Sequence, residues 1–148
     1  MNLSEIRQVL SEKEIQLTRS LGQNFMHDRN QICRIVESGE VSKADKVLEI
    51  GPGLGPLTEL LVEKAGTVLA IETDQRLVDI LRDKFKSVDN FEIIKGDALA
   101  ILRNERREWA DWKLVANLPY SVASPILVEF AKMPNGPKHI TTTLQFEV

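Results

Sequence analysis

A glycine-rich loop is the first feature of the chain with clear chemical meaning. The stretch EIGPGLGPLT (49–58) places Gly51, Gly53 and Gly55 directly after an apolar run. Glycines permit a tight turn and let a ligand approach bare backbone. A dinucleotide fingerprint would need its third glycine at position 56, but Pro56 stands there. The loop therefore disfavours a ligand that is held by its diphosphate.

Two acidic residues follow later apolar runs at comparable positions. Glu72 ends the run TVLAIE, 21 residues after Gly51, where a carboxylate can accept hydrogen bonds from both hydroxyls of a ribose. Asp97 in KGDAL either accepts from the amine of an adenine or caps a helix that starts at Ala98; the residues leave both open. Together these loops predict a pocket for an adenosine without a diphosphate.

A fourth stretch, VANLPYSVASP (115–125), joins a short apolar run to a carboxamide, a rigid turn and the only tyrosine of the chain. Asn117 and the backbone carbonyl of Leu118 can both accept hydrogen bonds, and Pro119 fixes the turn. Tyr120 offers an aromatic face for stacking. The stretch is suited to holding a planar group that carries an amine.

The pattern of apolar residues predicts alternating strands and helices around these loops. Strands are expected at 46–50, 67–72, 91–94, 113–117 and 139–146, and helices at 28–38, 56–65, 74–85, 98–109 and 124–132. Such alternation predicts an α/β fold with a mostly parallel, doubly wound sheet. Because ligands of such sheets bind at the carboxyl ends of the strands, the four loops should face one cleft.

Composition limits the classes of protein that remain. The 148 residues fit one domain, and a formal net charge of −3 argues against a chain that wraps nucleic acid by charge alone, while leaving room for a local basic patch. No apolar run reaches membrane-spanning length and the N-terminus has no signal-peptide core. We therefore expect a cytoplasmic protein. His27 and His139 have no partner at metal-ligand spacing, so no metal is expected.

Several motifs together resemble a known family. EIGPGLGPLT, AIETD, KGDAL and NLPY, in this order, look like the motifs of S-adenosylmethionine-dependent methyltransferases, and LGQNFMHD and LQFEV narrow the resemblance to the ribosomal RNA adenine N6-dimethyltransferases. The resemblance runs from about Leu21 to Val148. It implies a Rossmann-like methyltransferase fold and transfer of methyl groups from S-adenosylmethionine to N6 of adenine. The family includes enzymes of the small subunit and macrolide-resistance enzymes of the large subunit, and the leading expectation is that the target would be a pair of adjacent adenines in small-subunit ribosomal RNA.

The resemblance also implies roles for individual residues. Asn24 and Met26 would contact the cofactor from the N-terminal segment, and Gly51 and Gly53 would lie under its methionine part. Glu72 would hold the ribose, Asp97 the adenine amine, and Asn117 would lie between cofactor and substrate. Asn117 and the Leu118 carbonyl would then accept hydrogen bonds from the two N–H groups of the target amine, while Pro119 shapes the turn and Tyr120 stacks on the flipped base.

The same resemblance suggests how the chain is organised. Residues 1–40 would form a helical segment that lids the cofactor, and residues 41–148 the catalytic core. The family pattern continues past Val148 with further strands and a small helical domain. We therefore expect a partial catalytic domain that lacks the antiparallel edge strands. On its own, this domain is expected to bind RNA poorly and to methylate it poorly.

Three functional hypotheses remain open at this stage. The first is a monomeric enzyme, in its full-length form, that acts on the small ribosomal subunit. The second is a macrolide-resistance enzyme of the same family that acts on large-subunit RNA. The third is a non-catalytic RNA-binding or ribosome-assembly factor that keeps the fold and the cofactor site.

Overall fold

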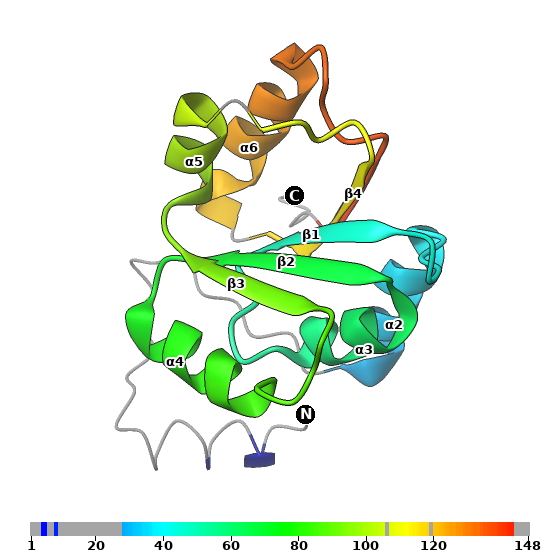
Figure 1. Cartoon of the computed structure of the whole chain (residues 1–148), viewed down its shortest axis with the longest axis vertical. Helices are drawn as coiled ribbons and strands as arrows, with labels where there is room; N and C mark the ends of the chain where they lie inside the picture. The colour runs from blue at the N-terminus through cyan, green and yellow to red at the C-terminus, as the bar shows by residue number, and fades with distance from the viewer. Residues whose placement is uncertain (1–3, 6–7, 9–27, 106, 119, 144–148) are drawn as a thin grey trace, which may run out of the picture.

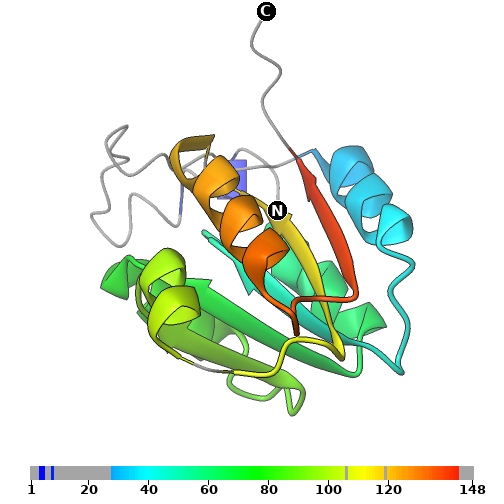
Figure 2. The ribbon, with the colours of Figure 1, turned by 90° about the horizontal axis from the view of Figure 1, so that it is seen from above.

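A five-stranded parallel sheet forms the centre of the protein. The computed structural model describes residues 4–5, 8, 28–105, 107–118 and 120–143. The strands are β1 (Lys46–Ile50), β2 (Thr67–Glu72), β3 (Phe91–Lys95), β4 (Trp112–Asn117) and β5 (His139–Thr143). All neighbours pair in parallel, in the order β3-β2-β1-β4-β5, so that β3 and β5 lie at opposite edges (Figure 2).

Helices cover both faces of this sheet (Figure 1). They are α2 (Arg29–Ser38), α3 (Pro56–Lys64), α4 (Gln75–Lys84), α5 (Ala98–Asn104) and α6 (Tyr120–Lys132). On one face, Val47, Val68 and Val115 pack against α2 and α3. On the other face, Leu48 and Leu114 pack against α5 and α6. Because the strands are buried on both sides, they read in the sequence as nearly continuous apolar runs.

The order of the strands creates a switch point between β1 and β4. From the central β1 the chain builds β2 and β3 on one side, and then returns to build β4 and β5 on the other. The loops that follow β1 and β4 therefore lead to helices on opposite faces of the sheet, and in open α/β sheets this is the point where ligands are expected to bind. These two loops carry the glycine-rich stretch and Asn117.

The predicted fold class is confirmed, and most elements lie where the sequence placed them. Helix α2 begins after Asp28, whose carboxylate accepts from the N–H groups of Asn30 (2.9 Å) and Gln31 (3.4 Å), and it ends at Gly39. Its apolar side packs into the core beside α3, so at least this part of the predicted lid segment is joined to the sheet. The predicted boundary at residue 40 stays a prediction.

Two helix boundaries differ from the prediction. Helix α5 ends at Asn104 rather than at 109, because Trp109 turns inward to pack against Trp112 and Phe130 with ring centroids 5.5 and 6.5 Å away. Helix α6 begins at Tyr120 rather than at 124, with Pro125 inside it. Pro125 therefore lies in the second turn of the helix, beyond the first turn where its missing N–H would cost nothing.

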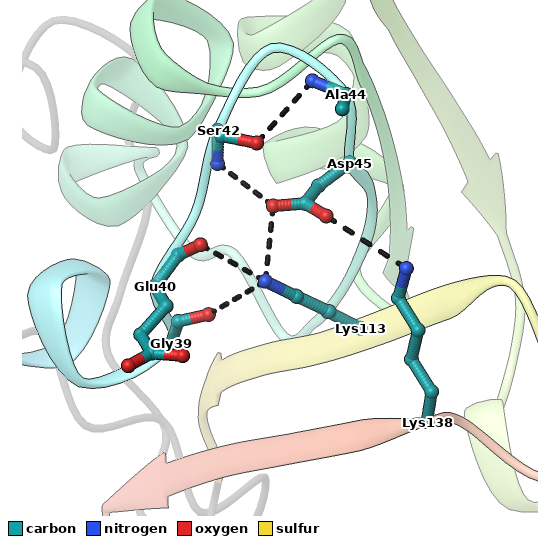
Figure 3. A network of polar contacts seen from close by, with 7 residues as sticks. All are labelled: Gly39, Glu40, Ser42, Ala44, Asp45, Lys113 and Lys138. Carbon is teal, nitrogen blue, oxygen red and sulfur yellow. Dashed lines mark hydrogen bonds and ion pairs between the residues drawn. The ribbon is translucent and has the colours of Figure 1, made fainter.

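A buried ion pair joins the elements at the amino ends of the strands (Figure 3). The Lys113 ammonium group lies 3.0 Å from a carboxylate oxygen of Asp45 and also donates to the carbonyls of Gly39 (3.1 Å) and Glu40 (2.9 Å). The same Asp45 oxygen accepts from the N–H of Ser42 at 2.7 Å. The contacts connect the segment between α2 and β1 to β4. They lie at the amino ends of the strands, whereas the four predicted site loops lie at the carboxyl ends.

In the described part of the chain, no helix combines the length and apolar character that crossing a bilayer requires.

Candidate functional site

The glycine-rich loop adopts a backbone that favours glycine at three positions. Gly51, Gly53 and Gly55 have φ angles of 68°, 62° and 85°, all in the left-handed region. At Gly55 a Cβ atom would also lie 2.7 Å from a methyl group of Leu81. The loop is closed by the N–H of Gly51, which donates to the carbonyl of Ile71 at 2.9 Å. The result is a turn that lies close to the end of β2 and leads into α3.

Glu72 joins three of the predicted site loops. One carboxylate oxygen accepts from the N–H of Gly53 at 3.2 Å and the other from the N–H of Asp74 at 3.1 Å. The backbone carbonyl of Glu72 accepts from the N–H of Gly96 at 2.9 Å, next to Asp97. The sequence predicted that these residues meet, and the hydrogen bonds bring the loops after β1, β2 and β3 together.

The environment of Glu72 leaves it able to accept further hydrogen bonds. Burial raises the pKa of this carboxyl, which is only 6% exposed, while the N–H groups of Asp74 and Gly53 partly offset that effect. Each carboxylate oxygen has more than one lone pair, so hydroxyl groups of a ligand can still donate to it. Such donors would stabilise the charged form of Glu72 and would lower its pKa.

A second buried carboxyl, Glu49, lies near the loop. Its side chain alternates with Leu48 and Ile50 along β1 and therefore faces α3, where the Thr58 hydroxyl donates to it at 2.6 Å. Burial raises the pKa of Glu49 to about 8, the Thr58 hydroxyl and the Lys84 ammonium lower it, and the Glu72 charge raises it. No motif in the sequence indicated Glu49, although it is an acidic residue inside a run of buried apolar positions.

The Glu49→Gln protein should lose a pH dependence of stability that the parent shows. The folded parent keeps a proton on Glu49 that the unfolded chain releases above a pKa of about 4.5, so its free energy of unfolding falls as pH rises from about 4.5 to 8. Glutamine is neutral throughout. The variant should therefore gain on the parent by up to about 1.4 kcal/mol per pH unit in this range.

Urea denaturation of both proteins at pH 5, 6, 7 and 8 measures this difference. Glu63→Gln is the matched control, because Glu63 is exposed on the same helix as Thr58, and it should follow the parent. A constant difference between Glu49→Gln and the parent across the range would show that Glu49 is ionised in the folded protein.

Helix α4 supports the glycine loop from behind. The Lys84 ammonium group donates to the carbonyl of Leu54 at 3.2 Å and forms an ion pair with Glu59 in the first turn of α3. Leu81 and Phe85 pack beside Gly55. These contacts depend on how α4 packs, and no motif in the sequence indicates them.

Asp97 caps helix α5 in this structure. Its carboxylate accepts from the N–H of Ala100 at 3.1 Å, and the side chain is exposed. The capping reading of the sequence is therefore confirmed. A contact with an adenine amine uses the same exposed carboxylate and stays a prediction.

Asn117 lies at the carboxyl end of β4. Its side chain alternates with Ala116, so it faces the same side of the sheet as Val115 and, in β1, Glu49. Its Oδ1 accepts a hydrogen bond from the hydroxyl of Thr143 in β5. The side chain of Leu118 is buried on the other face, in the core beneath α6. That burial anchors the backbone of the turn that follows β4.

Part of the predicted site lies outside the described residues. Asn24, Met26 and Pro119 lie outside the described residues, and Tyr120 is described only as the first residue of α6. Within the described residues, no three His, Cys, Asp or Glu side chains gather in a way that would hold a metal ion. The described part of the site thus offers bare backbone, buried carboxyls and one oriented carboxamide at the carboxyl ends of β1, β2 and β4.

Comparisons with known proteins agree with this arrangement. A family model described as ribosomal RNA adenine dimethylase matches residues 15–148. The Ribosomal RNA small subunit methyltransferase A of Clostridium botulinum (strain Okra / Type B1) is 42% identical over 143 residues, which are 96% of this chain and 52% of the relative. The protein of that name from Alkaliphilus oremlandii is 36% identical, over 96% of this chain and 51% of the relative. The chain thus spans about half the length of these relatives.

Solved structures show the same architecture. The 23S rRNA methyltransferase ErmE matches with a TM-score of 0.69 and 34% identity, over 82% of this chain and 48% of that one. A dimethyladenosine transferase from Plasmodium falciparum matches with a TM-score of 0.66 over 80% of this chain and 43% of that one, and at 23% identity it supports the fold alone. Since the family model covers nearly the whole chain, the protein belongs to the ribosomal RNA adenine dimethylase family.

Proposed function

We propose that this chain is the cofactor-binding part of an enzyme that transfers methyl groups from S-adenosylmethionine to N6 of adenines in small-subunit ribosomal RNA. The observation that carries the proposal is the junction at Glu72, where one buried carboxyl joins the glycine loop to the loops after β2 and β3. The relatives named small-subunit methyltransferases, at 36–42% identity, support the choice of RNA.

The residues present fit such a cofactor. The backbone of Gly51 and Gly53 lets a ligand approach closely, Glu72 can accept from ribose hydroxyls, and Asp97 can accept from an adenine amine. Asn24 and Met26 complete the proposed contacts. The buried carboxyl of Glu72 beside the loop disfavours a ligand with several phosphates and suits one with positive charge. When bound, S-adenosylmethionine supplies a methyl group on a positively charged sulfur.

The chain's own contribution to the transfer would lie at the end of β4. The N6 amine of adenine is a poor nucleophile because its lone pair is delocalised into the ring. Asn117 Oδ1 and the Leu118 carbonyl would accept hydrogen bonds from its two N–H groups and stabilise the positive charge that develops on nitrogen. Tyr120 would offer its ring to the flipped base. These contacts also fix the direction in which the nitrogen lone pair points.

A methyl-transfer assay with labelled cofactor and unmethylated small ribosomal subunits tests the proposal. Incorporation of label into two adjacent adenines of the small-subunit RNA is the expected result. Label in large-subunit RNA would favour the alternative that the likeness to ErmE supports. Cofactor binding without transfer by the longest natural form of the protein would favour the non-catalytic ribosome-assembly factor.

The proposal extends to the organisation of the whole protein. Because the chain spans about half of its relatives, we propose that a full-length form adds the remaining RNA-binding surface and acts as a monomer in the cytoplasm. Residues 1–40 would close over the cofactor and residues 41–148 would form the core beneath it. A gel-shift comparison of the RNA affinity of the 148-residue chain and of a longer form tests whether the added part supplies RNA-binding surface.

Removal of the Glu72 carboxyl should weaken cofactor binding. Calorimetry of Glu72→Ala with S-adenosylhomocysteine should show a loss of about 1–3 kcal/mol in binding free energy, the scale of lost hydrogen bonds to a charged group. Glu72→Gln, which keeps the size of the side chain, should show a smaller loss in the same direction. Glu92→Ala is the control, since Glu92 is exposed on the neighbouring β3. Unchanged affinity in both Glu72 variants would remove this residue from the site.

A further inference from the structure

We propose that Thr143 is a positioning residue for the transfer reaction, because its hydroxyl holds the carboxamide of Asn117 in the orientation that the substrate amine needs. The inference rests on the proposed function, since it assigns Thr143 a role through Asn117. Thr143 lies outside every motif that indicated the function, 26 residues after Asn117.

The arrangement of β4 and β5 brings the two side chains together. The strands pair in parallel, and Asn117 and Thr143 are register partners at their carboxyl ends. Register partners on neighbouring parallel strands point to the same face of the sheet, so the side chains lie next to each other. The Thr143 hydroxyl donates to Oδ1 of Asn117. The register of the strands and the hydrogen bond are thus two observations that both place these side chains in contact.

This hydrogen bond determines what Asn117 can offer. The last torsion of an asparagine side chain occupies broad, roughly two-fold wells, so a carboxamide without a partner rotates over a wide range. The Thr143 hydroxyl has one proton, and donating it to Oδ1 fixes the carboxamide plane. An amide oxygen has two lone pairs. One is used by Thr143, and the other remains for an N–H of the substrate amine.

We expect this hydrogen bond to favour the reaction by orienting the Asn117 carboxamide before the methyl group is transferred. An acceptor that is already aimed at the developing charge does not need to reorient during the reaction. Without the hydroxyl, the carboxamide would be in the productive orientation for a smaller fraction of the time. The effect belongs to the chemical step, since Thr143 does not hold any of the residues assigned to cofactor binding alone.

The test replaces the hydroxyl by a methyl group in the longest natural form of the protein. Thr143→Val keeps the size and the β-branched shape, and we expect kcat to fall about three- to tenfold, the population change that one hydrogen bond between neutral groups controls. The KM for the cofactor should not change. Thr143→Ser should restore kcat to within about twofold of the parent. Thr141→Val is the matched control, because Thr141 lies on the same face of β5 but pairs with Val115.

A double-mutant cycle separates positioning from a general structural role. If Thr143 acts through Asn117, Thr143→Val should cause no further loss of kcat in the Asn117→Ala background. If Thr143→Val lowers kcat by the same factor in the parent and in Asn117→Ala, the proposal is overturned. Equal kcat values for Thr143→Val and the parent would also overturn it. Absence of transfer by the parent itself would instead contradict the proposed function.

The side-chain amide resonances of Asn117 give a readout that does not need turnover. In the 148-residue chain, Thr143→Val should shift the two Nδ2 proton resonances of Asn117, while Thr141→Val should leave them in place. Resonances that move equally in both variants, or in neither, would show that the Thr143 hydroxyl does not hold the carboxamide.

Discussion

The Asn117→Ala protein is expected to transfer methyl groups about 10²–10³-fold more slowly than the parent, the usual loss when one preorganised contact to developing charge is removed. Cofactor affinity should change little. In the proposed mechanism the carboxamide meets the amine of the substrate, whereas the glycine loop and Glu72 hold the cofactor. Since Asn117 is part-buried at the strand end and contacts Thr143, alanine at this position also frees the Thr143 hydroxyl.

Single-turnover methyl transfer with saturating cofactor measures this loss, and calorimetry with S-adenosylhomocysteine measures the affinity. Asn104→Ala is a suitable control, because Asn104 is exposed at the end of α5. Near-normal turnover by Asn117→Ala would exclude the carboxamide from amine positioning. Equal losses of transfer and of cofactor affinity would instead place Asn117 in the cofactor site.

The sequence predicted the fold because its signals are local. Each strand is a short apolar run, helices α2, α4 and α5 each begin at a capping aspartate, and the alternation of strands and helices leaves few topologies other than a parallel, doubly wound sheet. The glycine loop, Glu72, Asp97 and Asn117 each follow directly after a strand. Since the carboxyl ends of parallel strands lie at the same end of the sheet, residues that follow the strands come together there. This can be predicted without knowing how the side chains pack.

Features that depend on contacts between distant residues were not predictable in this way. Thr143 meets Asn117 only because β4 and β5 pair in one register, and a shift by one residue would turn Thr143 to the other face. Helix α5 stops early because Trp109 must reach the core. The polar residues before Trp109 are compatible with a longer helix, so local propensity gave no sign of the stop.

The largest effect on stability is expected at the amino ends of the strands, in the ion pair of Lys113 and Asp45 (Figure 3). Both side chains are largely buried, at 13% and 8% exposed. Removing Lys113 leaves the Asp45 charge with only the Ser42 N–H and the exposed Lys138 as partners, so Lys113→Met should lower the free energy of unfolding by about 3 kcal/mol. The variant also removes the donor to the carbonyls of Gly39 and Glu40.

Lys138 provides the matched control. Its ammonium group lies 3.9 Å from the other carboxylate oxygen of Asp45, and its side chain is 49% exposed. Solvent screens such a pair, so Lys138→Met should cost well under 1 kcal/mol. Urea denaturation of the two lysine variants and the parent, at pH 7, compares a buried and an exposed partner of the same carboxylate. Equal losses would show that burial does not determine the strength of the contact.

The pH dependence of this loss identifies its cause. Burial opposes ionisation of Asp45, but the N–H of Ser42 and the Lys113 ammonium outweigh it and hold the pKa of Asp45 below its ordinary value. A lowered carboxyl pKa contributes stability above the unfolded-state pKa and loses it as pH falls through the folded-state pKa. Protonated Asp45 needs no counter-ion, so the gap between the parent and Lys113→Met should narrow below about pH 4. A gap that stays constant from pH 7 to pH 3 would assign the loss to the packing of the lysine stem and the two carbonyls. Because the network lies far from the four loops, cofactor affinity of folded Lys113→Met should equal that of the parent.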